Sequence, residues 1–359
     1  MNRKGLALLS LMLATGLPIS LSAEQNHVIV VSGLGGAQEY RDRFYEWSIR
    51  LVDAAIDRHG IPADQVVFLA EQPDRDPDRI RARSTWENIQ TAITEVAEHA
   101  AFDDLVLIVL IGHGSFSGSV SHFNLPGPDP TVVDFAVALN ELRDQQVVFV
   151  NTATASGEFI AGLSGPKRTI ITATKTARER NETKFGEFFV EAFAGRVGPE
   201  FETPTATNSV NEIAIDDVAD ANKDGRVSLL EAFDYTRRQV ARVYEESGLL
   251  LTEHAMLDDN GDGYGSDEPD PLTAGADGRI AQALFFTPSG RLTTAELETD
   301  DPTLMRLYAE RNAIEKRVLA HRTLRDGMDS AIYEQELERL LIDLALKNRE
   351  IRKAEDGAP

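Results

Sequence analysis

The sequence predicts an α/β protein built on a largely parallel β-sheet, and two patterns support that prediction. From Glu24 onward, short runs of β-branched and other apolar residues recur along the chain, and amphipathic stretches at helical spacing separate them. Continuous apolar runs are typical of parallel strands because helices cover both faces of such a sheet. A length of 359 residues suggests two domains, and 42% hydrophobic residues suffice for an ordinary core.

Six strands are expected, separated by helices. The strands cover His27–Ser32, Val66–Ala70, Leu105–Ile111, Val147–Asn151, Arg168–Ala173 and, after a long gap, Arg279–Phe286. The helices cover Tyr40–His59, Trp86–Ala100, Thr131–Leu142, Thr183–Ala194 and Leu229–Glu246. The gap before the sixth strand is too long for an ordinary connection, which predicts an insertion at about residues 205–272. Ligands of such sheets bind beyond the carboxyl ends of the strands.

The amino terminus has the pattern of a secretory signal peptide over residues 1–23. Arg3 and Lys4 precede the uncharged run Gly5–Ser22, and Ala23 is a suitable cleavage point. No other segment is long and apolar enough to span a membrane. We therefore expect an exported protein, periplasmic or secreted, without a membrane anchor after cleavage.

The carboxyl-terminal segment, residues 291–359, predicts a helical arm. It is rich in Leu, Ala, Glu and Arg, and its apolar residues recur at spacings of three and four on both sides of Arg325-Asp326-Gly327. This pattern favours a helical hairpin or short coiled coil. Such an arm packs on its own domain, or it mediates self-association or binds a protein partner, and the sequence is compatible with each.

Composition excludes several classes of function. The chain has no cysteine, which excludes disulfides, zinc-thiolate sites and a thiol nucleophile. Its formal net charge of −23 disfavours binding to nucleic acid and to anionic membrane surfaces, and it favours divalent cations, although solubility alone would also explain it.

Two strand ends carry residues suited to chemistry. The strand Leu105–Ile111 runs directly into Gly112-His113-Gly114, which places an imidazole on a glycine-flanked loop. The following strand opens into the small residues Thr152–Gly157, among them Thr154 and Ser156. Because both loops follow strands of one parallel sheet, they are expected at the same edge.

This pair of strand ends resembles the caspase and legumain clan of cysteine peptidases, and the legumain-like branch most closely, over roughly residues 27 to 195. Glu39-Tyr40-Arg41 stands where legumains carry Asn-Tyr-Arg, and Thr152–Gly157 stands where they carry Glu-Ala-Cys-x-Ser-Gly. The resemblance implies a caspase-like three-layer sandwich over residues 24–290. It also implies that His113 matches the catalytic histidine and that Arg41 lines the pocket for the residue before the cleaved bond.

The same resemblance places Thr154 where the family has its nucleophilic cysteine, and Glu39 replaces an asparagine that assists catalysis. A threonine hydroxyl needs a positioned base, whereas a thiolate forms readily near neutral pH. We therefore expect an inactive pseudopeptidase that binds a peptide or protein at the His113 cleft. The alternative is a hydrolase of peptide bonds that uses Thr154 or Ser156 with His113 as base.

Residues Asp220–Glu231 read D-A-N-K-D-G-R-V-S-L-L-E, the pattern of a twelve-residue EF-hand loop for Ca²⁺. The expected ligands are Asp220, Asn222, Asp224, the carbonyl of Arg226, Ser228 and the bidentate carboxylate of Glu231. A second loop repeats the early part of the pattern, with Asp258, Asn260, Asp262 and Tyr264 as further candidate ligands, but Pro269 takes the place of the closing glutamate. Calcium is expected to order the insertion and the wall of the adjoining cleft. A further alternative is an EF-hand interaction module with the α/β domain as carrier.

Overall fold

The computed structural model describes residues 25–102, 104–195, 219–222, 226–286, 303–304, 306–307, 310–311, 314, 317–318, 321 and 330–356. The expected signal peptide, the calcium ligand Asp224 and part of the expected insertion lie outside these residues. In the described part, no helix is long and apolar enough to cross a membrane.

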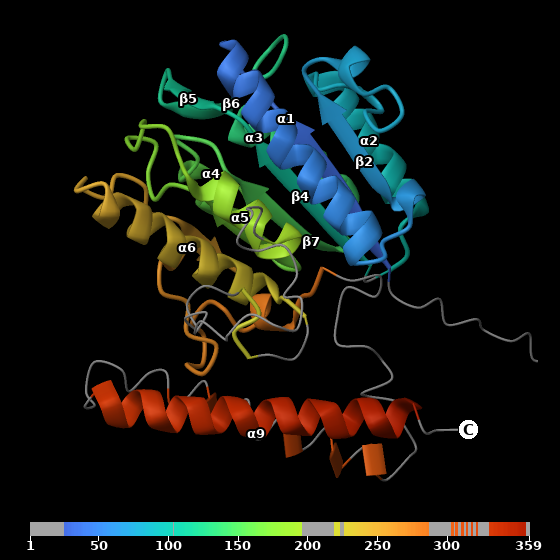
Figure 1. Cartoon of the computed structure of the whole chain (residues 1–359). Helices are drawn as coiled ribbons and strands as arrows, with labels where there is room; N and C mark the ends of the chain where they lie inside the picture. Colours follow the sequence, from blue (N-terminus) through green and yellow to red (C-terminus); the bar gives the residue numbers. More distant parts are fainter. Residues whose placement is uncertain are drawn as a thin grey trace, which may run out of the picture.

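The core is a seven-stranded sheet in the order β3-β2-β1-β4-β7-β8-β9 (Figure 1). Its strands are β1 (Asn26–Ser32), β2 (Val66–Ala70), β3 (Ala82–Arg83), β4 (Leu105–Ile111), β7 (Gln146–Asn151), β8 (Arg168–Thr172) and β9 (Met256–Asp258). All neighbours are parallel except β8 and β9, which are antiparallel. A separate antiparallel hairpin, β5 (Gly114–Ser117) with β6 (Val120–Phe123), follows β4.

The mostly parallel sheet and its first five long strands are confirmed, but the expected sixth strand is wrong. Within Arg279–Phe286 the chain forms a short 3-10 helix, Ala281–Ala283, and β9 is the strand at this edge of the sheet. The buried carboxylate of Asp259 accepts the N–H groups of Ile280 (2.8 Å) and Ala281 (2.8 Å). A side chain that caps these donors favours a helical turn over an extended strand.

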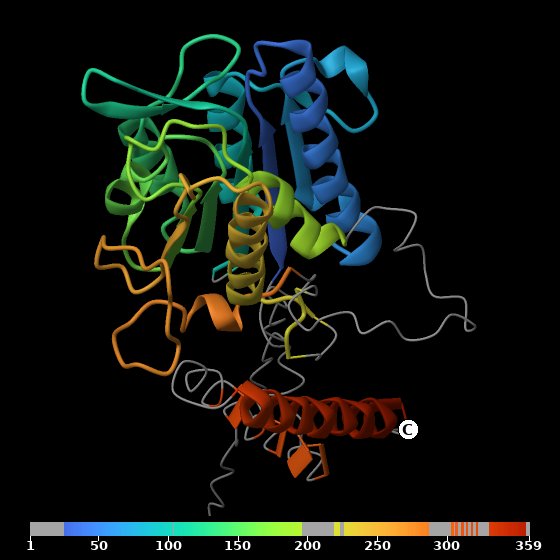
Figure 2. The ribbon, with the colours of Figure 1, turned by 60° about the vertical axis from the view of Figure 1, so that its left-hand side comes forward.

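Helices cover both faces of the sheet, as expected for a three-layer sandwich. One face carries α1 (Gln38–Asp53, continued by a π-helical turn, Ala54–Arg58), α5 (Phe185–Ala194) and α6 (Leu229–Glu246). The other face carries α2 (Trp86–His99), α3 (Val132–Ala138, followed by the 3-10 turn Leu139–Leu142) and α4 (Glu158–Leu163). Figure 2 shows α5 and α6 side by side on their face.

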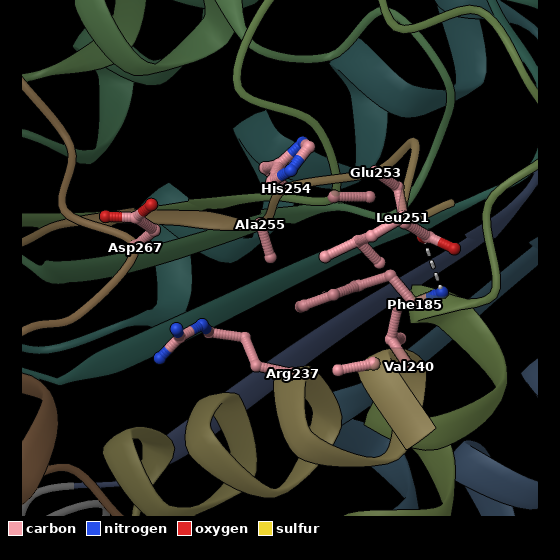
Figure 3. A pocket seen from close by; sticks show the side chains of 10 residues that line it. Phe185, Arg237, Val240, Leu251, Glu253, His254, Ala255 and Asp267 are labelled. Atoms are coloured by element: carbon pink, nitrogen blue, oxygen red, sulfur yellow. Dashed lines mark hydrogen bonds between the residues drawn. The ribbon is translucent and has the colours of Figure 1, made fainter. Parts of the chain in front are cut away.

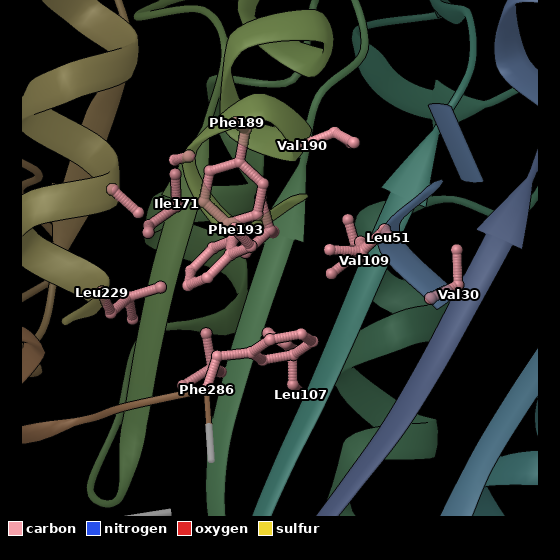
Figure 4. Packing of buried hydrophobic residues seen from close by; sticks show 14 of the residues in the cluster. Val30, Leu51, Leu107, Val109, Ile171, Phe189, Val190, Phe193, Leu229 and Phe286 are labelled. Atoms are coloured by element: carbon pink, nitrogen blue, oxygen red, sulfur yellow. The ribbon is translucent and has the colours of Figure 1, made fainter. Parts of the chain in front are cut away.

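Alternate residues of each central strand supply two separate cores. On β1, Val28 and Val30 pack with the α1 and α5 side chains, whereas Ile29 and Val31 pack with α2. Figure 4 shows the first core, in which Phe189 and Phe193 of α5 reach the sheet beside Leu107 and Val109. Burial of each such side chain contributes about 1.5–3 kcal/mol, which makes this two-sided burial the main source of stability.

The carboxyl-terminal arm contains the long helix α9 (Ser330–Asp356). The described residues between 303 and 321 are also helical, and two small apolar clusters join them to α9. One contains Leu304, Leu307 and Ile351, and the other contains Val318, Leu337, Leu340 and Leu341. The segments before and after Arg325-Asp326-Gly327 thus pack together, as a hairpin requires, while self-association stays a prediction.

Candidate functional site

The two loops singled out in the sequence meet at the carboxyl edge of the sheet. β4 and β7 are neighbours, so the loop after Ile111 lies beside the loop after Asn151. The contact is so close that a Cβ atom on Gly114 would lie 2.2 Å from the carbonyl oxygen of Thr154. Only glycine fits at position 114, and this explains one glycine of the His-Gly motif.

The two candidate nucleophiles are held by their own loops. The hydroxyl of Thr154 donates to the carbonyl of Gly114 (2.9 Å) and accepts the Gly114 N–H (3.3 Å). The hydroxyl of Ser156 lies 3.1 Å from the hydroxyl of Thr174, and Ser156 is 1% exposed. Between them, Ala155 has a φ of +55°, a left-handed conformation that is costly for a residue with a Cβ atom. The loop therefore keeps a strained shape, but neither hydroxyl points to a base.

The ring of His113 lies in an aromatic corner formed by α1. The rings of Tyr40 and Phe44 meet it edge-on, with centroids at 4.6 Å and 4.8 Å. Burial lowers the pKa of His113, Glu182 opposes this shift, and Arg43 adds to it. The ring makes no hydrogen bond to any residue that the structure describes. His113 and Thr154 thus lie on adjoining loops without the hydrogen bond that links a base to its nucleophile.

Arg41 does not join His113. Its guanidinium donates to the carbonyl of Gly36 and to the side chain of Gln38, and it lines a small hollow together with Glu71 and Arg75. The pocket role expected for Arg41 stays a prediction. The arginine whose charge acts on His113 is Arg43, two residues further along α1.

Arg43 belongs to a polar network that sequence reasoning missed. Its guanidinium binds the carboxylates of Glu39 (2.7 Å) and Glu182, and Glu182 also accepts a hydrogen bond from the Tyr40 hydroxyl (3.1 Å). Tyr40, Arg43 and Phe44 stand at positions i, i+3 and i+4 of α1, so they share one helix face. The sequence could have indicated through this spacing that Arg43, and not Arg41, shares the helix face of Tyr40 and Phe44 beside the His113 loop.

A connecting segment, residues 174–184, forms the wall behind this site. The carbonyl of Glu179 accepts the Ala155 N–H (2.9 Å), and its carboxylate pairs with His254 Nδ1 (2.7 Å). The Thr183 hydroxyl donates to the carbonyl of Thr152 (2.7 Å). Glu182 and Glu179 of this segment thus connect α1, the Thr154 loop and the strap of residues 251–255 that precedes β9.

The first acidic loop lies at the opposite, amino edge of the sheet. Ser228 caps α6 in a reciprocal capping box with Glu231, and Glu231 also accepts the N–H groups of Ala221 (3.2 Å) and Asn222 (3.1 Å). Ser228 forms a β-bridge with Phe285, whose carbonyl accepts a hydrogen bond from Asn26 at the start of β1. The eighteen residues of α6, which begins at this edge, make the helix about 27 Å long. The expectation that calcium orders the insertion and the wall of the adjoining cleft stays a prediction.

The other expected ligands of this loop are only partly described. Asp220 and Asn222 lie in the turn that leads into Glu231, and the guanidinium of Arg226 lies over the ring of Phe285, 4.5 Å from its centroid. Asp224 lies outside the described residues. Within those residues, no group of three or more His, Asp or Glu side chains is close enough to hold a metal ion. The calcium site at residues 220–231 stays a prediction.

The second acidic loop follows β9 and also runs to the amino edge, where Gly261 approaches Gly165. The carboxylate of Asp258 accepts the N–H groups of Gly261 (3.0 Å) and Gly263 (3.2 Å). Asn260 accepts the N–H of Asp262 (2.8 Å), and Asp262 accepts that of Tyr264 (2.7 Å). The oxygens of the three predicted side-chain ligands thus accept backbone N–H groups of their own loop, in which Asn260 and Asp262 are exposed. The second calcium site stays a prediction.

Among solved structures, the chain is similar to caspase-1 from Spodoptera frugiperda, with a TM-score of 0.38 and 11% sequence identity over 66% of this chain and 87% of that chain. No protein-family model matches the sequence, and no curated protein matches it.

Proposed function

We propose that this protein is a non-catalytic relative of the legumain-like peptidases that binds a peptide or protein ligand beside His113. The observation that carries the proposal is the pairing of the Thr154 hydroxyl with both backbone groups of Gly114. That pairing occupies the hydroxyl at the position where the family has its thiol. Its proton is donated to the Gly114 carbonyl and not to the His113 ring.

Chemistry supports the same conclusion. A hydroxyl nucleophile requires a base within about 2.6–3.2 Å and a third group that orients the base. His113 is the candidate base. Among the described residues, its ring makes no hydrogen bond to a candidate nucleophile and none to an orienting group, and its neighbours are the rings of Tyr40 and Phe44. Ser156, the other candidate, is buried against Thr174. The alternative of a hydroxyl-based hydrolase would require both loops to rearrange.

The polar groups beside His113 are suited to binding a ligand. Tyr40, Arg43 and Glu182 offer a hydroxyl, a cation and a carboxylate that are part-buried and already connected, so a polar ligand meets donors and acceptors in fixed positions. Preorganised groups of this kind lower the entropic cost of binding. The Arg43–Glu182 pair takes the place that the family resemblance assigns to Arg41.

Activity is tested with purified protein and a peptide library, with and without millimolar calcium. We expect no turnover by the wild type. Turnover that disappears in His113→Ala would contradict the proposal and favour the hydrolase. Labelling of Thr154 or Ser156 by a hydroxyl-directed covalent probe would do the same.

Binding is tested on a peptide array with paired arginine variants. Arg43→Gln removes the cation beside His113, and we expect it to weaken binding about tenfold, as the loss of one charge-assisted hydrogen bond does. Arg41→Gln is the matched control, because the hydrogen bonds of its guanidinium to described residues go to Gly36 and Gln38 and not to the His113 corner. Ile342 is exposed on α9. If replacing Ile342 by a charged residue abolishes binding instead, the arm is the interaction surface and the α/β domain is its carrier.

Calcium binding is a second proposal, supported by the carboxylate and amide oxygens that Asp258, Asn260 and Asp262 place on one tight loop. Calcium at 100 times its dissociation constant should stabilise the fold by about 2.7 kcal/mol, which thermal melting with calcium and with chelator detects. Asp262→Ala should reduce the shift, and Asp64→Asn, a charge change on an exposed residue elsewhere, should leave it unchanged. If calcium stabilises Asp262→Ala and Asp64→Asn equally, the loop of residues 258–264 is not the calcium site.

A further inference from the structure

A second hollow lies outside the His113 corner, on the α5–α6 face of the sheet. It is formed by residues from segments far apart in the sequence: Ala173, Phe185, Arg237, Val240, Ala241, Leu251, Glu253, His254, Ala255 and Asp267 (Figure 3). Its volume is about 90 Å³, the share of about three water molecules at about 30 Å³ each. A small branched aliphatic group fits such a space.

The walls of this hollow are apolar. Phe185, Val240, Leu251 and Ala255 surround its centre, as Figure 3 shows. Beside it, Leu249 and Leu250 are 64% and 87% exposed, so apolar surface continues from the hollow onto the outside of the molecule. Both features favour a ligand with an aliphatic body, because its burial removes apolar area from water.

Two of the four charged or titratable groups at the hollow are already satisfied. Glu253 is turned away onto the N–H groups of Lys184 (2.8 Å) and Phe185 (3.2 Å) at the start of α5. His254 is paired with Glu179 at 2.7 Å. Both side chains thus already have a partner in the described part of the chain.

The other two charges are poorly satisfied. Among the described residues, Arg237 has long ion-pair contacts, 3.9 Å to Asp234 and 3.7 Å to Glu268, whose side chain is 85% exposed, and its guanidinium lies 5.8 Å from the centre of the Phe233 ring. Asp267 has no hydrogen bond or ion pair with any residue in the described part of the chain, Arg237 included. A guanidinium and a carboxylate thus line the same small apolar hollow and remain available to a ligand.

Figure 3 places the Arg237 guanidinium and the Asp267 carboxylate on the same side of the hollow, across from Leu251 and Phe185. A ligand that satisfies both carries a carboxylate for Arg237 and an ammonium for Asp267 at one end, and an aliphatic body at the other. We propose that the hollow binds an aliphatic α-amino acid in its zwitterionic form, with the side chain between Phe185, Val240 and Leu251.

Charge around the mouth favours the zwitterion over simpler ions. Asp234 and Glu268 lie beside Arg237, and the whole chain carries a formal net charge of −23, so an anion alone is repelled on approach. A cation alone leaves Arg237 without a new acceptor. The zwitterion is neutral overall and satisfies both groups at once.

The experiment is calorimetric titration of the full-length protein with leucine. We expect a dissociation constant on the order of 1 mM, as a ligand of this size allows. The comparison ligands are 4-methylpentanoate, which lacks the ammonium, isoamylamine, which lacks the carboxylate, and 5-aminopentanoate, whose charges lie at opposite ends. Each should bind about tenfold more weakly than leucine, because each loses one charge-assisted contact.

Variants locate the site. Arg237→Gln and Asp267→Asn should each weaken leucine binding about tenfold. Ala241→Phe, a change at an exposed position of the mouth, should block it without disturbing the core. Arg242→Gln is the control, since Arg242 lies on the same helix but pairs with Glu246. No detectable binding of leucine at 50 times that expected constant, or equal affinity in Arg237→Gln and Arg242→Gln, overturns the proposal.

Discussion

Glu253 is a buried carboxylate whose ionisation should cost the folded protein stability. The residue is 3% exposed, and its side chain accepts the N–H groups of Lys184 and Phe185 at the start of α5. Burial raises the pKa of Glu253 from 4.5 to about 7, although those hydrogen bonds and the Tyr244 hydroxyl oppose the shift. The cost of removing the charged carboxylate from water is therefore larger than the gain from its hydrogen bonds at the start of α5.

The sign of the effect on stability follows from the two pKa values. Below pH 4.5 the carboxyl group is protonated in both states, and it contributes no difference. Between pH 4.5 and about 7 the unfolded chain loses this proton first, so the free energy of unfolding falls as the pH rises. At about 1.4 kcal/mol per pKa unit, the fall amounts to about 3 kcal/mol and is complete above pH 7.

Glu253→Gln tests this value, because the amide oxygen keeps an acceptor for the two N–H groups and cannot ionise. By urea denaturation we expect the variant to match the wild type near pH 4.5 and to exceed its free energy of unfolding by up to about 3 kcal/mol at pH 8. Glu245→Gln, on the exposed end of α6, is the control and should change the pH dependence little. A variant that is less stable than the wild type at pH 8 would refute the reasoning, since the hydrogen bonds of the carboxylate would then outweigh its desolvation.

Three further substitutions test the packing of the site and core. Gly114→Ala places a Cβ atom against the Thr154 carbonyl and should cost about 1–3 kcal/mol in urea denaturation, whereas Gly165→Ala, with open space around it, should change stability by less than about 1 kcal/mol. Thr131→Ala removes the capping box of α3 and should cost about 1 kcal/mol by thermal melting. Phe149→Ala, at a fully buried position of β7, should cost about 3–5 kcal/mol, and a smaller loss would mean that the core closes over the cavity.

The strands with continuous apolar runs could be predicted from sequence because burial on both faces leaves a local pattern. β9 could not, since three residues show no periodicity and their pairing with β8 depends on a distant segment. The β5–β6 hairpin was missed although an indication existed. Apolar and polar residues alternate around Gly118 and Ser119, whose positive φ values form the turn.

The place of the two loops, but not the direction of their side chains, could be predicted from the strands. A strand end locates a loop, so His113 and Thr154 were correctly placed at one edge. The direction of a hydroxyl depends on tertiary hydrogen bonds, and nothing near Thr154 in the sequence indicates that Gly114 binds it. The hollow beside Arg237 was beyond prediction, because segments remote from one another in the sequence contribute its lining.

The positions of the acidic loops limit what calcium can do in this fold. The start of α6 is tied to the amino edge of the sheet by the backbone hydrogen bond from Leu229 to Leu284 and by the bridge from Ser228 to Phe285. A cation held by the loop before Ser228 would stabilise these closing contacts and the first turn of α6. The same helix carries Arg237 two turns later, so we expect a cation bound there to affect the proposed amino-acid site through the placement of α6.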